Sequence, residues 1–112
     1  MKDNHNELHE QFSQSMKTIT AIGDEVRQNI IITLLECGCY GFRVGEITNR
    51  THLSRPAISH HLKILCNANI VKVKKQGTMN FYFLNPDRQE IQNIYNLCGS
   101  ILELMDKMQM QE

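Results

Sequence analysis

The segment from residue 53 to residue 65, LSRPAISHHLKIL, concentrates side chains that could bind a ligand or react. Two adjacent histidines, His60 and His61, stand there beside an arginine, a lysine and two serines. Such groups can hold a metal ion, move protons or contact a polyanion. Neighbouring residues of a helix point about 100° apart, so these two histidines cannot chelate one ion together. The two histidines are interpreted as side chains that contact DNA or pack within the protein, with metal binding as the alternative.

A helical wheel divides this segment into an apolar face and a polar face. Leu62 and Leu65 fall within about 40° of Ile58, at roughly 100° per residue, and the three should face a core. His61 lies at the edge of that face. The opposite face is short, polar and basic, which suits a helix laid in the DNA major groove. The residues predicted to contact DNA from this helix are Ser54, Arg55, Pro56, Ser59, His60 and Lys63.

Charge is distributed unevenly along the chain. The 112 residues carry no net charge, which by itself does not favour a nucleic-acid partner. Residues 43–76, however, carry a net charge of +6, and the remainder carries −6. This asymmetry within one small domain predicts a basic face for a polyanion on a protein that is neutral overall.

The helices that position this segment are indicated by caps and apolar spacing. An amphipathic helix is expected near residues 8–20. Asp24 is a candidate N-cap or first-turn acid of a second helix, which should end near Gly38 or Gly41. Residues 44–66 are predicted to form a helix-turn-helix, with Ser54 as the N-cap of its second helix and Pro56 in the first turn of that helix.

The pattern then changes to strand type. IVKVKK and MNFYFL are rich in β-branched and aromatic residues, and QGT between them is a hairpin signal, so residues 70–84 should form a wing. The wing residues predicted to contact the DNA backbone are Lys72, Lys74, Lys75 and Gln76. A final helix is expected over residues 87–110. The fold predicted for residues 1–112 is a single winged helix-turn-helix domain, mainly α with a small β-hairpin.

The first and last helices carry apolar stripes. Ile91, Ile94, Cys98, Ile101, Met105 and Met108 repeat at alternating spacings of three and four, as in helices that pack against another long helix. Leu8, Phe12, Met16 and Ile19 form a similar stripe near the start. A second copy of the chain is the simplest cover for both, so a homodimer is predicted. The interface residues would be Leu8, Phe12, Ile94, Cys98, Ile101 and Met105.

Composition excludes several other classes of protein. No apolar run approaches the roughly 18 residues of a membrane span, and residues 1–10 do not resemble a secretory leader, so a cytoplasmic protein without a membrane partner is expected. The sequence contains no nucleophile–base–acid set, phosphate-binding glycine loop or metalloprotease motif, so no enzymatic activity is predicted. The alternative function is a winged helix that binds proteins without sequence-specific DNA binding.

Cysteines and two early histidines leave alternatives open. Cys37, Cys39, Cys66 and Cys98 are expected to be reduced thiols in the cytosol. Structural packing, a thiol switch or binding of zinc or another soft metal are all compatible with Cys37, Cys39 and Cys98. His5 and His9, at i and i+4, could share a metal but lack further ligands, so surface histidines are the simpler interpretation.

The stretch VGEITNRTHLSRPAISHHLKILCNANIVKVKKQGTMNFYFL resembles the ArsR/SmtB family of bacterial winged-helix repressors. The resemblance covers roughly residues 21–84. It implies a homodimeric repressor that binds double-stranded DNA at an inverted-repeat operator and is released by an inducer, a thiol oxidant or persulfide or a metal ion. The sequence departs from the family at His52, where glycine is usual before the recognition helix, and at Thr48, where alanine is usual. His52 is therefore expected to take a positive φ.

The resemblance also bears on the sensor. Metal sensors of the family carry a cysteine motif in the third helix or Asp/His pairs in the last one, and both are absent from this sequence. Other members sense oxidants or persulfides through one cysteine in the second helix and one in the last. Cys37 or Cys39 with Cys98 would match that arrangement, although the second-helix cysteines lie a few residues later than the family's position.

Overall fold

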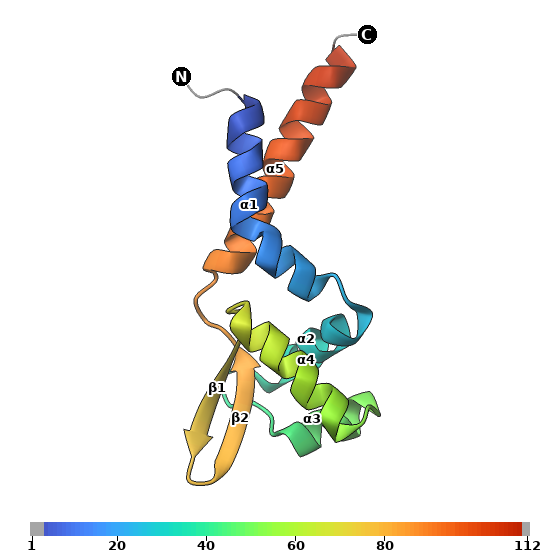
Figure 1. Cartoon of the computed structure of the whole chain (residues 1–112), viewed down its shortest axis with the longest axis vertical. Helices are drawn as coiled ribbons and strands as arrows, with labels where there is room; N and C mark the ends of the chain where they lie inside the picture. Colours follow the sequence, from blue (N-terminus) through green and yellow to red (C-terminus); the bar gives the residue numbers. More distant parts are fainter. Residues whose placement is uncertain (1–3, 111–112) are drawn as a thin grey trace.

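The computed structural model describes residues 4–110, which form five helices and one antiparallel hairpin (Figure 1). The element order agrees with the predicted winged helix-turn-helix. The elements are α1 (Asn4–Ile22), α2 (Glu25–Cys37), α3 (Val44–Thr51), α4 (Arg55–Asn67), β1 (Val71–Gln76), β2 (Met79–Leu84) and α5 (Gln89–Met110).

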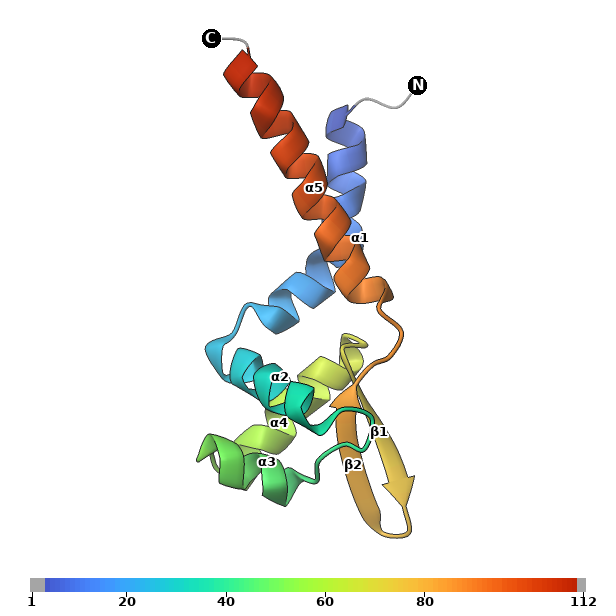
Figure 2. The ribbon, with the colours of Figure 1, turned by 180° about the vertical axis from the view of Figure 1, so that it is seen from behind.

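Two parts of the molecule are distinct in both views (Figures 1 and 2). Helices α1 and α5 lie side by side and form an arm. Helices α2, α3 and α4 and the hairpin pack together at one end of this arm and form the winged half of the molecule. The arm gives the molecule its elongated shape, 58 Å in the longest direction and 26 by 21 Å across. Where the helices of the arm meet, Thr18 of α1 donates a hydrogen bond to Glu90 of α5 at 3.1 Å.

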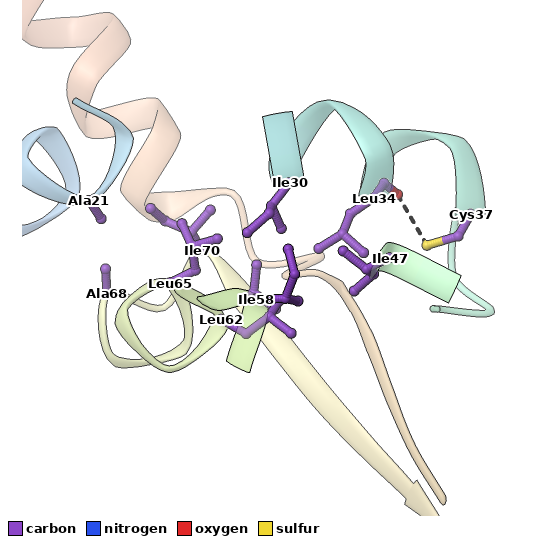
Figure 3. Packing of buried hydrophobic residues seen from close by; sticks show 11 residues of the cluster. Ala21, Ile30, Leu34, Cys37, Ile47, Ile58, Leu62, Leu65, Ala68 and Ile70 are labelled. Carbon is purple, nitrogen blue, oxygen red and sulfur yellow. Dashed lines mark hydrogen bonds between the residues drawn. The ribbon is translucent and has the colours of Figure 1, made fainter. Parts of the chain in front are cut away.

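The core lies where α2, α3, α4 and the hairpin meet (Figure 3). Ile58, Leu62 and Leu65 of α4 are 0, 1 and 0% exposed, which confirms the face predicted from the wheel. Burying an aliphatic side chain of this size contributes about 2 kcal/mol to folding. The other buried apolar residues packed here are Ala21, Ile30, Leu34, Cys37, Ile47, Ala68, Ile70 and Val71.

The predicted helix starts are confirmed by their caps. Asp24 accepts a hydrogen bond from the backbone N–H of Arg27 at 3.1 Å, and Ser54 accepts one from Ala57 at 3.3 Å. Both residues have extended backbone, as an N-cap requires. Pro56 lies in the first turn of α4, where its missing N–H leaves no helical bond unmade.

Two tight turns set the geometry of the winged half. His52 ends α3 with φ 60° and ψ 23°, which confirms the predicted left-handed conformation. Gly41, with φ 83°, precedes a short bridge in which Phe42 and Tyr82 exchange two backbone hydrogen bonds of 2.8 Å. A Cβ on Gly41 would lie 3.0 Å from the Tyr82 carbonyl oxygen, so this turn needs glycine.

The predicted apolar series on α5 is only partly covered within the chain. The helix does pack against a second long helix, α1. Its most buried residue, however, is Leu97, 2% exposed, which lies outside the predicted series. Ile91, Met105 and Met108 of that series are exposed. The helix carries two apolar faces, and spacing alone could not tell which one α1 covers.

The turn at His52 gives a stability prediction. The left-handed conformation costs a residue with a side chain about 1 kcal/mol, and glycine avoids that cost. The greater backbone freedom of glycine in the unfolded chain offsets part of the resulting stabilisation. His52→Gly should therefore raise the free energy of unfolding in urea by roughly 0.5 kcal/mol, whereas His52→Val should lower it by more than about 1 kcal/mol.

The matched control is Asn49→Gly, at an exposed position inside α3. Glycine there should lower the free energy of unfolding by a few tenths of a kcal/mol, because it has the lower helix propensity. Equal losses from both glycine substitutions would show that the backbone at His52 is not strained.

Candidate nucleic-acid interface

The second helix of the helix-turn-helix presents its predicted contact residues to solvent. The buried face of α4 points into the core, so the opposite face is free (Figure 3). All six residues predicted from the sequence are exposed, and they run from the N-terminus of the helix to its middle: Ser54, Arg55, Pro56, Ser59, His60 and Lys63.

The hairpin adds a second basic surface beside α4. It projects from the end of the molecule opposite the free end of the α1–α5 arm (Figures 1 and 2). The four residues predicted on it are all exposed on β1: Lys72, Lys74, Lys75 and Gln76. Because side chains alternate along a strand, Lys72 and Lys74 share one face of the hairpin and Lys75 lies on the other. The wing therefore presents cations on both of its faces.

Three residues near α3 change the extent of the predicted basic surface. Arg43 and Asn49 line a polar groove of about 460 Å³ together with Arg55 and the acidic Glu46. They adjoin the predicted contacts, although the sequence did not single them out. Arg50 is used within the protein. It pairs with Glu36 at 2.9 Å, and its guanidinium lies 4.4 Å from the centre of the Phe42 ring.

The adjacent histidines have different environments. His60 is exposed, whereas His61 is half-buried, and their rings meet edge to face with centroids 5.4 Å apart. The Nδ1 atom of His61 lies 3.1 Å from a guanidinium nitrogen of Arg27. His5 and His9 are both exposed at the start of α1. Within residues 4–110, no group of three or more histidine, cysteine or acidic side chains could hold a metal ion.

The four cysteines are free thiols that differ in accessibility. Cys37 points into the core, where its thiol lies 3.1 Å from the Leu34 carbonyl oxygen (Figure 3), and burial raises the pKa of that thiol. Burial also raises the pKa of the Cys66 thiol. Cys39 and Cys98 are exposed. No disulfide joins Cys98 to Cys37 or Cys39, since all of these thiols are free.

Comparisons with known proteins agree with this geometry. The family profile described as "Bacterial regulatory protein, arsR family" matches residues 25–73. The HTH-type transcriptional regulator MJ1325 of Methanocaldococcus jannaschii is 39% identical over 79 residues, covering 70% of this chain and 86% of that protein. The arsenical resistance operon repressor of Bacillus subtilis is 30% identical over 89 residues, covering 78% of each chain.

A solved structure shows the same fold. The ArsR family transcriptional regulator RHA00566 superposes with a TM-score of 0.70 at 16% identity, covering 84% of this chain and 92% of that one. The helix-turn-helix, the wing and these matches define a DNA-binding transcriptional regulator rather than an enzyme. The chain belongs to the arsR family of bacterial regulatory proteins. Over residues 4–110, no helix is long and apolar enough to cross a membrane.

The cysteine environments predict an order of reactivity. The thiolate is the nucleophile, so a buried thiol with a raised pKa should react slowly at neutral pH. Iodoacetamide should modify the exposed Cys39 at least about tenfold faster than Cys37 and Cys66. Mass spectrometry of peptides at timed intervals measures the four rates in one sample, and urea-unfolded protein is the control in which the differences should vanish. Equal rates in the folded protein would contradict the burial of Cys37 and Cys66.

Proposed function

We propose that this regulator is a homodimeric repressor that binds an imperfect inverted repeat, with one α4 helix in each of two successive major grooves. The observation that carries the proposal is the division of α4 into a fully buried apolar face and an exposed polar face that begins at the helix N-terminus. Helix-turn-helix dimers read half-sites about one turn, roughly 34 Å, apart. The operator is therefore expected to be a repeat with that spacing.

The exposed residues of α4 divide into two roles. Ser59, His60 and Lys63 lie along the exposed face of the helix, where side chains reach base edges. Ser54 and Arg55 lie at its N-terminus, where phosphates are favoured. The lysines of the wing supply contacts to the DNA backbone that carry no sequence information themselves.

Dimerisation through the arm is supported by apolar surface that the single chain leaves uncovered. On α5, Ile91, Tyr95, Leu102 and Met105 are exposed and share one face with Cys98 at spacings of four and three. On α1, Phe12, Met16 and Ile19 are exposed in the same way. Continuous stripes of this kind on neighbouring helices are typical of an interface between two copies. Leu8, Ile94 and Ile101 are half-buried, and we place them at the margin of that interface.

Release by an inducer completes the proposal. The exposed thiol of Cys39 supports oxidation or persulfide chemistry, with Cys98 on the interface stripe as its candidate partner and with zinc or a similar metal ion as the alternative inducer. A direct bond between Cys98 and Cys37 or Cys39 needs α-carbons within about 7 Å of each other. Operator affinity with a persulfide donor, with peroxide and with Zn²⁺ separates these inducers.

The first test uses DNA selected by the protein from a random pool. Lys75→Ala should weaken binding to the selected duplex and to random duplex about equally and should reduce the slope against log salt by about 1. His60→Ala should change which base pairs are preferred. Wild-type protein that binds every duplex equally, or fails to bind DNA, would point instead to a protein-interaction module.

The second test concerns the dimer. Leu102→Glu would place one charge from each copy in the interface. The cost of burying these charges should give monomers at micromolar concentration. Asn96→Glu is the matched control. It adds the same charge on another face of α5 and keeps an oxygen to accept the hydrogen bond from Gln92. Sedimentation should show a dimer for wild type and Asn96→Glu, and a wild-type monomer would end the proposal of a dimer.

A further inference from the structure

A buried arginine links the arm to the helix that reads DNA. Arg27, in the first turn of α2, has a side chain that is only 11% exposed. Its Nε donates to the carbonyl oxygen of Ala21 at 2.6 Å, and a terminal nitrogen donates to that of Thr20 at 3.2 Å. Both acceptors belong to the last turn of α1, where free carbonyls and the helix dipole favour a cation.

The same guanidinium reaches α4. Its other terminal nitrogen lies 3.1 Å from Nδ1 of His61, whose side chain is 17% exposed. An arginine can only donate, so Nδ1 of His61 must accept and its proton must be on Nε2. Arg27 thus holds α1, α2 and α4 together through one rigid, planar group.

We propose that Arg27 is a positioning residue for DNA binding: by joining the end of α1 to His61 of α4, it fixes the angle between the dimer arm and the recognition helix. The inference rests on the proposed dimer. In such a dimer the two arms form a common frame, so the angle at each Arg27 sets the distance between the two recognition helices. That distance decides which half-site spacing the protein accepts.

His61 is surrounded by polar and charged groups. From α2 it faces the Arg27 guanidinium and the Asp24 carboxylate, whose nearer oxygen is 4.0 Å from the same Nδ1 atom, and its own helix adds His60. From α1, the carbonyl oxygens of Ala21 and Thr20 accept hydrogen bonds from Arg27. The hydrogen bond from the Arg27 backbone lowers the pKa of Asp24, so this carboxylate stays charged. The link to Arg27 therefore depends on an acceptor at the position of the His61 Nδ1 atom.

The chain offers a matched control beside Arg27. Gln28 also caps the end of α1, donating from Nε2 to the Ile22 carbonyl oxygen at 2.9 Å. Its side chain lines the groove between α2 and α5, away from His61. Gln28→Ala therefore removes a cap of α1 and leaves the link to α4 intact, whereas Arg27→Gln removes both.

The experiment measures affinity for the inverted repeat selected by wild-type protein and for the same repeat with two base pairs inserted between the half-sites. Arg27→Gln and His61→Leu should each lose about tenfold in affinity for the selected repeat and most of the preference over the inserted one. The double variant should be no worse than either single variant, since both break one link. Gln28→Ala should behave as wild type.

His61→Asn supplies the conservative rescue, because the Asn Oδ1 atom takes the place of Nδ1 as acceptor and does not titrate. It should keep the spacing preference of wild type at pH 8. Circular dichroism should be used to check that each variant is folded, and sedimentation to check that it is dimeric. If Arg27→Gln does not fold, the Leu and Asn variants of His61 carry the test.

Three results would overturn the inference: unchanged spacing preference in His61→Leu, additive losses in the double variant, or equal losses in His61→Asn and His61→Leu. A failure of the proposed function is distinct, because wild-type protein would then show no preference for an inverted repeat over random DNA.

Discussion

The rotation of α4 about its own axis is the constraint on which the DNA-binding surface depends. Ile58, Leu62 and Leu65 are almost completely buried, and together they leave only one orientation of the helix in which no large aliphatic side chain faces water. The polar face is exposed as a consequence. Packing, rather than any contact made by the polar residues themselves, therefore aims Ser59, His60 and Lys63 outward.

In the proposed dimer, a second level of organisation places that surface relative to the partner copy. The arm of α1 and α5 extends away from the winged half, so small changes of angle at the junction are amplified at the DNA. Arg27 occupies that junction with hydrogen bonds to both sides. In our account, the core determines which residues face DNA, the arm brings two such faces together, and the junction sets their separation.

Local signals in the sequence predicted much of the structure. The caps at Asp24 and Ser54, the strained turn at His52 and the hairpin all depend on residues within a few positions of one another, so each could be recognised without knowing the fold. The inward face of α4 followed from a single helical period. The exposure of the ten predicted contact residues then followed from that face and from the hairpin.

What the sequence did not predict depends on contacts between distant segments. Leu97 was missed because α5 has two apolar faces and only the position of α1 decides between them. Arg27 was missed because its partner on α4 lies 34 positions along the chain. Arg50 counts as a cation in the basic segment, yet Glu36 neutralises it across 14 positions. Net charge and apolar spacing are properties of the linear sequence, whereas the contacts of Leu97, Arg27 and Arg50 arise from the fold.

The most direct test of the account is a hydroxyl-radical footprint of the wild-type protein on its selected operator. We expect two protected segments related by two-fold symmetry, on one side of the duplex, with centres about one helical turn apart. Protection should extend beyond each half-site where the wing lies. A single protected segment without symmetry would contradict the central claim, because it would mean that one recognition helix, rather than a pair held by the arm, binds the DNA.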